Sequence, residues 1–424
     1  MMTTRTKTIG AFTPKLITVL REGYGAKELK ADALAGLTVA IVALPLSMAI
    51  AIGSGAKPEH GLFSAIVGGF VISLLGGSRF QIGGPAAAFI GLIATTIARF
   101  GYDGFLLATL MAGFVLLALG YLRLGTLIRH IPHPVLTGFT AAIAVIIFSN
   151  ELRDLFGLTL KVDPSEVIGR LAALWEARSS ANPVTIGLSV ACLALMLWLR
   201  KIAPSFPGLL IGVVLSGLAV WAFGLPVETV GTKFGGIPNA LPSPSLPAFD
   251  LARLTELLPT ALALAFLGGM ESLLSAVVAD GMSGRQHRSN CELVAQGYAN
   301  IACALFGAIC ATGTIARTAT NIRAHAHGPV SGILHAVFLL LFLVLAAPLA
   351  AYVPLAALAC VLALVAWNMI EKETIAKIFK HDRAAASVIA LTFVLVAFVD
   401  LIAGIAAGAV LGIILQRTGH LKAH

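Results

Sequence analysis

The stretch QIGGPAAAFIG, residues 81–91, interrupts a chain that is apolar on both sides of it. It opens on the polar amide of Gln81, continues through the flexible pair Gly83 and Gly84, and reaches Pro85 just before an apolar helix could begin. Proline is favoured in the first turn of a helix, where its missing N–H costs nothing. The stretch therefore predicts a short helix that starts inside an apolar region, with Pro85 in its first turn.

The composition of the whole chain indicates a polytopic membrane protein. The 424 residues are 58% hydrophobic and only 12% charged, whereas soluble proteins carry about a quarter charged residues. One membrane span needs roughly 20 residues, so the length allows up to about fourteen spans. The net charge of +9 fits cytoplasmic loops rich in Lys and Arg, and it argues against nucleic acid as a partner.

Sequence motifs for metal sites and for hydrolysis are missing from the chain. The five cysteines form neither a CxxC motif nor close pairs, which argues against a metal site or a disulfide framework. No Walker loop, GxSxG or HExxH motif occurs, so neither ATP drive nor hydrolysis is supported. We therefore expect no metal, no cofactor and no enzymatic activity.

Fourteen apolar segments follow one another along the chain, seven on each side of a Pro-rich stretch. They fall at about 37–55, 61–76, 85–98, 104–122, 134–149, 184–200, 208–223, 257–278, 290–309, 315–327, 328–348, 353–370, 384–399 and 401–416. The third segment of each half is too short to cross a hydrocarbon core of ~30 Å. Because seven is odd, the second half must be inserted upside down relative to the first.

The basic residues orient the chain in the membrane. An even number of crossings puts both termini on one side, and twenty basic residues of the loops and tails fall on that side against eight on the other. This bias predicts that both termini are cytoplasmic. Short, Gly- or Pro-interrupted segments at matching places in two inverted halves indicate the binding site of a transporter.

The partner of the opening stretch is ATGTIARTATNIR, residues 311–323. Each of the two follows a short β-compatible stretch, 80–82 and 308–311, and each contains glycine before its helix. Two helix N-termini that face each other near the midplane form an anion site from backbone N–H groups and helix dipoles, and Arg317 adds one positive charge. The alternative is a pair of ordinary kinks, with Arg317 reaching the membrane surface.

Glu271 is the other charged residue near the middle of a span, and Ser275 lies one turn further on the same helix face. A carboxylate in this position can bind a coupling cation or take up a proton. Because no further acid occurs in the central turns of this span, the sequence favours a proton over sodium. The alternative role of Glu271 is that of a permanent counter-ion for Arg317.

Three stretches of the chain resemble the sulfate permease (SulP) family of anion transporters. They are DALAGLTVAIVALPLSMAIAIGSG at 32–55, GGPAAAF at 83–89, and ESLLSAVVADGMSGRQHRSNCELVAQGYANIACALFGAICATGTIARTATNIRAHAHGPVSGILHA at 271–336. The resemblance runs from about 32 to 417, and the third stretch is most similar to the bacterial branch that includes dicarboxylate transporters. It implies an all-α fold of fourteen transmembrane segments in a 7+7 inverted repeat of the uracil-permease type, with short β-stretches before half-helices 3 and 10.

The resemblance also implies a division of the chain into domains. A core (transport) domain would comprise 34–124 and 257–349, a gate domain 125–256 and 350–417, and cytoplasmic tails 1–33 and 418–424. Most family members continue into a cytoplasmic STAS domain, which is absent from this sequence, since it stops at His424 soon after the last span. Either the sequence is truncated or it belongs to a member without that domain.

Residue by residue, the resemblance implies a substrate site and a coupling site. The substrate-binding positions would be Ile50, Gly84, Pro85, Ala86, Ala87, Thr314, Ile315, Ala316 and Arg317. The ion-coupling positions would be Glu271 and Ser275.

These features lead us to expect a secondary active transporter of small anions in the bacterial inner membrane, coupled to protons and moving by an elevator-like mechanism. C4-dicarboxylates are the preferred substrates, with sulfate and bicarbonate as the other candidates, and the protein is expected to form a homodimer. The alternatives are an uncoupled anion channel or exchanger, a sodium-coupled bicarbonate transporter, and a membrane receptor that transports nothing.

Overall fold

The computed structural model describes residues 10, 12–126, 133–160, 164, 167–203, 207–247, 251–399 and 401–418, and this part of the chain is helical apart from one small sheet. The elements of the first half are α2 (Lys15–Glu22), α3 (Ala26–Gly53), α4 (Pro58–Phe63), α5 (Gly69–Leu75), β1 (Gly83–Gly84), α6 (Ile90–Tyr121), α7 (His133–Phe156), α8 (Val167–Glu176), α9 (Pro183–Ile202), α10 (Gly208–Phe223) and α11 (Val230–Phe234). Those of the second half are α12 (Leu251–Ser283), α13 (Ser289–Leu305), β2 (Thr312–Gly313), α14 (Ile315–Arg323), α15 (Val330–Ala350), α16 (Leu355–Met369), α17 (Lys372–His381), α18 (Arg383–Phe398) and α19 (Leu401–Arg417).

Each of the fourteen apolar segments corresponds to helix in the structure. Eight described helices are long and apolar enough to cross a membrane, and three shorter apolar helices accompany them. The third and fourth segments form one helical stretch, Ala87–Tyr121, which is broken at Gly101 (φ 72°, ψ 175°). A positive φ is accessible to glycine at little cost, so Gly101 separates the short third segment from the full fourth one.

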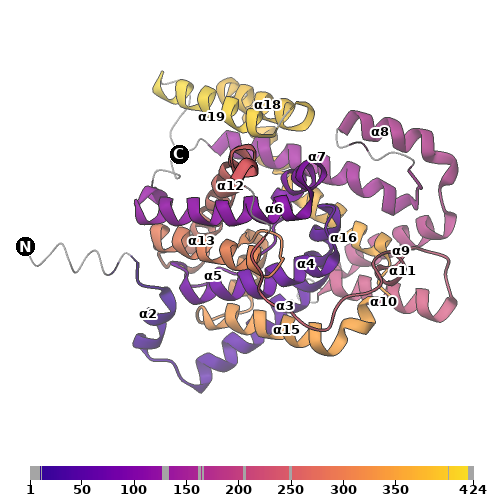
Figure 1. Ribbon diagram of the computed structural model, residues 1–424, viewed down its shortest axis with the longest axis horizontal. Coiled ribbons are helices and arrows are strands. Elements are labelled where there is room, and N and C mark those ends of the chain that lie inside the picture. The colour runs from indigo at the N-terminus through magenta and orange to yellow at the C-terminus, as the bar shows by residue number, and fades with distance from the viewer. Residues whose placement is uncertain are drawn as a thin grey trace, which may run out of the picture.

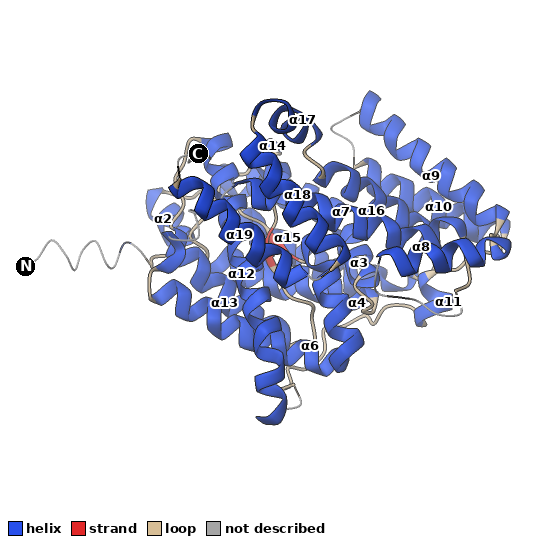
Figure 2. Cartoon of the chain, turned by 90° about the horizontal axis from the view of Figure 1, so that it is seen from above, coloured by secondary structure: helices blue, strands red, loops and turns tan. Residues whose placement is uncertain are grey.

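The two short segments meet inside the molecule. The strands β1 and β2 pair antiparallel, with Gly83 opposite Gly313 and Gly84 opposite Thr312, and Figure 2 shows them enclosed by helices. Each strand leads into a helix, through a 3₁₀ turn at Ala87–Phe89 in the first half and directly into α14 in the second. The predicted β-stretches are thus present, although each strand begins just after the predicted residues.

The predicted position of Pro85 is wrong by two residues. Ala86, in an extended conformation (φ −119°, ψ 140°), is the residue that precedes the first helical turn. Pro85 therefore lies outside the helix, between the strand and the turn. The cause is the strand pairing, which keeps the backbone extended past Gly84, a feature that the helix preference of proline alone does not predict.

The helices sort into two groups by their contacts. In one group α3 packs on α15, and α6 packs on α12 and α13. In the other group α7 packs on α16 and α18, and α9 packs on α10 and α16; in Figure 1, α8 to α11 lie together at one end of the molecule. Glycines permit close packing: a methyl group on Gly113 of α6 would lie 2.9 Å from the carbonyl oxygen of Gly297 of α13, as expected where small residues let membrane helices approach.

Three amphipathic helices, α2, α8 and α17, lie outside the apolar segments. The sequence analysis placed their residues in tails and loops, because it searched for long apolar runs and these helices have only one apolar face. Of the predicted tails, residues 1–9, 11 and 419–424 lie outside the described residues.

Candidate functional site

The candidate anion site lies where α3, the start of α6 and the start of α14 meet. Arg317 is 1% exposed although it is charged. Its Nη2 donates hydrogen bonds to Ser47 Oγ at 3.0 Å and to the carbonyl oxygen of Pro85 at 3.3 Å, and its Nη1 donates to the carbonyl oxygen of Gly83 at 3.4 Å. Arg317 therefore points inward toward β1, and it does not reach the membrane surface as the alternative from the sequence required.

Gly84 leaves the space through which Arg317 passes. A methyl group on Gly84 would lie 1.8 Å from Arg317 Nη1, and Gly84 has a φ of +152°. Both the space and the backbone conformation thus require glycine at this position. On the neighbouring strand, space alone favours glycine at position 313, since a methyl group there would lie 1.5 Å from Nε2 of Gln81.

Both helix starts lack a side-chain cap. Ala86 has no polar atom that could cap the first helix, and the hydroxyl of Thr314, which precedes α14, makes no capping hydrogen bond. Oγ1 of Thr314 is buried and has no hydrogen-bond partner. The first N–H groups of each helix have no acceptor within the helix, so they are free to bind an anion.

The substrate positions implied by the family differ in exposure. Ile50, Pro85, Ala86 and Thr314 are buried, whereas Ala87 is partly exposed and Ile315 and Ala316 are exposed. The pairing of β1 with β2 and the hydrogen bonds of Arg317 bring the two helix starts together, and Ile50 lies one turn beyond Ser47 on α3. The role of the nine positions in substrate binding stays a prediction.

Glu271 of α12 is partly exposed and forms no ion pair with Arg317 among the described residues. Its Oε2 is buried and has no hydrogen-bond partner, although Arg317 lies close enough to interact with it electrostatically. Ser275 has another partner, because it donates a hydrogen bond to Thr318 Oγ1 at 3.2 Å. A carboxylate without a fixed partner is available to an exchangeable proton or cation, which a permanent counter-ion is not.

A buried polar network behind the site was not found in the sequence. Nε2 of Gln81 donates to Oγ of Ser272 at 2.6 Å, and Ser272 donates to Oε1 of Glu292 at 3.2 Å. Glu292 is fully buried, and its Oε2 accepts hydrogen bonds from the backbone N–H groups of Gly77 at 2.9 Å and Ser78 at 3.0 Å. The network joins the loop before β1 to α12 and α13; a glutamate inside the apolar segment 290–309 was the signal that could have revealed it.

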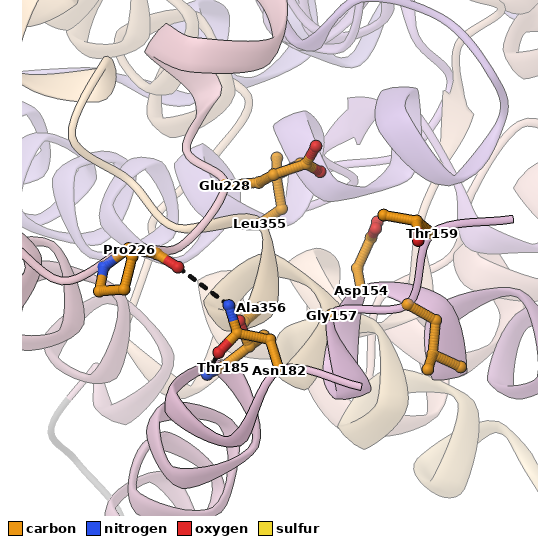
Figure 3. A pocket seen from close by; sticks show the side chains of 10 residues that line it. Asp154, Gly157, Thr159, Asn182, Thr185, Pro226, Glu228, Leu355 and Ala356 are labelled. Carbon is orange, nitrogen blue, oxygen red and sulfur yellow. Dashed lines mark hydrogen bonds between the residues drawn. The ribbon is translucent and has the colours of Figure 1, made fainter. Parts of the chain in front are cut away.

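A surface pocket lies elsewhere, between the end of α7 and the starts of α9 and α16 (Figure 3). In it, Asn182 donates a side-chain hydrogen bond to the carbonyl oxygen of Pro226 at 3.0 Å. The pocket also contains the carboxylates of Asp154 and Glu228, which lie 3.9 and 3.6 Å from Nζ of Lys233. Asp154 also pairs with Arg153 at 3.0 Å, so the carboxylates of this pocket already have basic partners.

Comparison with known proteins identifies the family. The sequence profile of the sulfate permease family matches residues 29–392, which is most of the chain. The chain belongs to the sulfate permease family. The SulP membership predicted from the sequence is thereby confirmed, and the protein is a membrane transporter of small anions and not an enzyme.

Two bacterial relatives and one animal relative illustrate the similarity to other SulP proteins. A Bacillus subtilis protein named "Putative sulfate transporter YvdB" is 42% identical over 394 residues, which is 93% of this chain and 74% of that protein. The solved transmembrane domain of a cyanobacterial bicarbonate transporter, BicA, is 31% identical with a TM-score of 0.81, over 90% of this chain and 98% of that one. Murine Slc26a9, solved in the inward-facing state, has 16% identity but a TM-score of 0.87 over 97% of this chain and 72% of that one.

These structural similarities confirm the predicted fold. The protein is an all-α polytopic membrane protein with the 7+7 inverted repeat of the SulP transmembrane domain. We also predicted a similarity to the dicarboxylate transporters of the family. The relatives described above are not named as dicarboxylate transporters, so this part stays a prediction.

Proposed function

We propose that this SulP protein is a secondary active transporter that moves a small anion together with a proton. The observation that carries the proposal is the arrangement of two uncapped helix starts around Arg317, beside the carboxylate of Glu271, which has no fixed partner. The helix starts and Arg317 supply positive potential for an anion. Glu271 supplies the group that can bind and release a proton.

Sulfate is the first candidate substrate. The relative at 42% identity is named a putative sulfate transporter, while the bicarbonate transporter has 31% identity. C4-dicarboxylates were preferred from the sequence because of one stretch alone, and they now rank after these two anions. The test is a thermal-shift panel with sulfate, bicarbonate, fumarate and succinate, since a bound ligand stabilises the protein by RT ln(1 + [L]/Kd). A shift with fumarate and none with sulfate would restore the original preference.

Proton coupling is tested by uptake into proteoliposomes. An inwardly directed proton gradient should accelerate uptake in the wild type and not in Glu271→Gln, which keeps the shape of the side chain but has no titratable proton. Exchange of one anion for another should survive in Glu271→Gln, because the helix starts and Arg317 remain. If a sodium gradient drives uptake at constant pH, the coupling ion is sodium and not a proton. If neither gradient changes the uptake rate, the protein is an uncoupled channel or exchanger.

We further propose an elevator-like movement of the core domain, 34–124 and 257–349, against the gate domain, 125–256 and 350–417. The contact pattern supports this division, because most helix contacts fall within the two groups and fewer join α3 and α6 to α7, α10 and α16. The anion site belongs to the core, so it would travel with it. Cytoplasmic termini, location in the bacterial plasma membrane and a homodimer stay predictions.

A further inference from the structure

Glu151, in the second-last turn of α7, is a buried acid that the proposed transport cycle does not use. Its side chain is 5% exposed, and no hydrogen bond or ion pair within the described part of the chain reaches its carboxylate. The sequence analysis ended the fifth apolar segment at residue 149, so Glu151 was assigned to a loop. In the structure it is instead part of a membrane span.

The core domain covers Glu151. A methyl group on Gly53, the last residue of α3, would lie 3.2 Å from Glu151 Oε1, 3.0 Å from Cδ1 of Leu362 and 3.6 Å from Cδ1 of Ile90. Gly53 and Ile90 belong to the proposed core, whereas Glu151 and Leu362 belong to the proposed gate. Glu151 Oε1 is therefore covered on one side by a contact between the two parts that are proposed to move, and the residue as a whole keeps only 5% of its surface exposed.

This contact lies next to the candidate anion site along both α3 and α6. Gly53 lies three residues beyond Ile50 on α3, and residues so spaced share one face of a helix. Ile90 is the first residue of α6, directly after the turn at Ala87–Phe89.

The charged and titratable groups that face Glu151 have partners of their own. On α7, Arg153 contacts Asp154 at 3.0 Å, and from α11 Lys233 lies between Asp154 and Glu228. From α8, Arg170 donates to the side chain of Asn150 and to the carbonyl oxygen of Pro164. From α16, the thiol of Cys360 donates to the carbonyl oxygen of Ser189 at 3.4 Å. Gly53 of α3 covers Glu151 and carries no charge, and Ile90 of α6, which lies beside Gly53, carries none either.

We propose that Glu151 is a second proton-binding site, and that it must be protonated for the core to close against the gate at Gly53. This inference rests on the proposed function, because it requires that the core moves. An ionised carboxylate that loses water without gaining a donor or a cation is strongly disfavoured, whereas the neutral acid fits an apolar contact. When the core moves away, Glu151 gains water and can ionise. Glu271 then couples the proton to the anion, while Glu151 makes closure depend on pH.

The test is anion exchange at equal pH on both sides of the vesicle, which involves no proton gradient. The probe is radiolabelled sulfate, or fumarate if wild-type vesicles take up fumarate instead. In the Glu271→Gln variant, exchange should slow by about tenfold or more as the pH rises from about 5 to about 8. With Glu151→Gln added, the rate should be nearly constant over that range, because the amide stays neutral.

Two further variants separate a proton site from a structural role. Glu151→Asp, added to Glu271→Gln, should keep the dependence on pH even if its rate is lower. Asp154 is a carboxylate one turn further along α7 that has cationic partners. Asp154→Asn should therefore leave the pH dependence of exchange unchanged. An equal pH dependence with and without the Glu151 carboxylate would overturn the inference, as would loss of the dependence in Asp154→Asn.

Failure of the proposed function would look different. If Glu271→Gln still takes up anion in response to a proton gradient, Glu271 is not the coupling group, yet the pH dependence of exchange still reports on Glu151. If Glu271→Gln exchanges no anion at all, the exchange rates of the wild type and of Glu151→Gln are compared over the same pH range. An equal change of rate with pH in those two proteins would again refute the role of Glu151.

Discussion

At the scale of single residues, Arg317 connects the two halves of the anion site. It belongs to α14, but its hydrogen bonds go to the backbone oxygens of Gly83 and Pro85 and to Ser47 of α3. The guanidinium thus fixes the positions of both helix starts and contributes charge behind them. Its Nε is buried without a partner, which leaves one donor for a bound anion or water.

Arg317→Ala should weaken sulfate binding at least thirtyfold, because loss of one partner of a charge pair in a dehydrated site costs about 2–5 kcal/mol. The measurement is isothermal titration on purified, monodisperse protein, with Arg323→Ala, at the other end of α14, as the control. Wild-type affinity in a folded Arg317→Ala variant would show that the guanidinium does not contribute to the site.

Gly84→Ala should disturb the same site through the backbone. The added methyl group would collide with Arg317 Nη1, and alanine disfavours a φ of +152°. We expect loss of sulfate binding together with a lower melting temperature. Gly281→Ala is the matched control, because a methyl group there meets nothing within 4 Å, so equal melting temperatures for the two variants would contradict the explanation.

At the scale of elements, α2 is tied to the loops at one end of the core. Arg79 lies 2.5 Å from the carboxylate of Glu22, the backbone N–H of Lys15 donates to Gly76 at 2.9 Å, and Arg288 donates to the carbonyl oxygen of Thr13 at 2.7 Å. These contacts join the N-terminal segment to the residues before β1 and to the loop between α12 and α13. The N-terminal segment therefore links two loops that belong to opposite halves of the chain.

The pH dependence of this attachment follows from Glu22. The hydrogen bond from Arg79 holds the pKa of Glu22 below its ordinary value of 4.5. A carboxyl group whose pKa is lowered by docking stabilises the docked state above its ordinary pKa, and this contribution is lost as the pH falls through the lowered value. Limited proteolysis should thus find α2 protected at neutral pH and cleaved faster once the pH falls below the lowered pKa of Glu22. Glu22→Gln should be cleaved faster already at neutral pH, and a variant as resistant as the wild type would show that the pair does not hold α2.

At the scale of the whole molecule, the proposed elevator movement predicts which cross-links stop transport. Gly53→Cys with Leu362→Cys, joined by a short bifunctional maleimide in a background without native cysteines, should abolish uptake, because the link ties core to gate. Tyr121→Cys with Tyr298→Cys, joined by a longer reagent, should leave uptake intact, since α6 and α13 both belong to the core and their tyrosine hydroxyls lie 3.1 Å apart. Uptake that persists in the first linked variant would rule out a core that slides past the gate at Gly53.

The sequence by itself determined the number of spans, the inversion of the second half and the two broken third segments. These features depend on local properties, namely the length of apolar runs and the positions of Gly and Pro within them. Local preference failed where a distant contact competed with it: Pro85 precedes its helix because the pairing of β1 with β2 keeps the chain extended.

Only the tertiary structure decided which polar groups meet. Arg317 and Gly83 are 234 residues apart, and Gln81 and Ser272 are 191 residues apart, so no spacing along the chain indicates either contact. The same holds for Glu151, which a search for apolar runs assigns to a loop and which the fold buries against Gly53. The physical reason is that a buried polar group is stable only with partners or in its neutral form. Whether partners lie within reach depends on how the two inverted halves pack together.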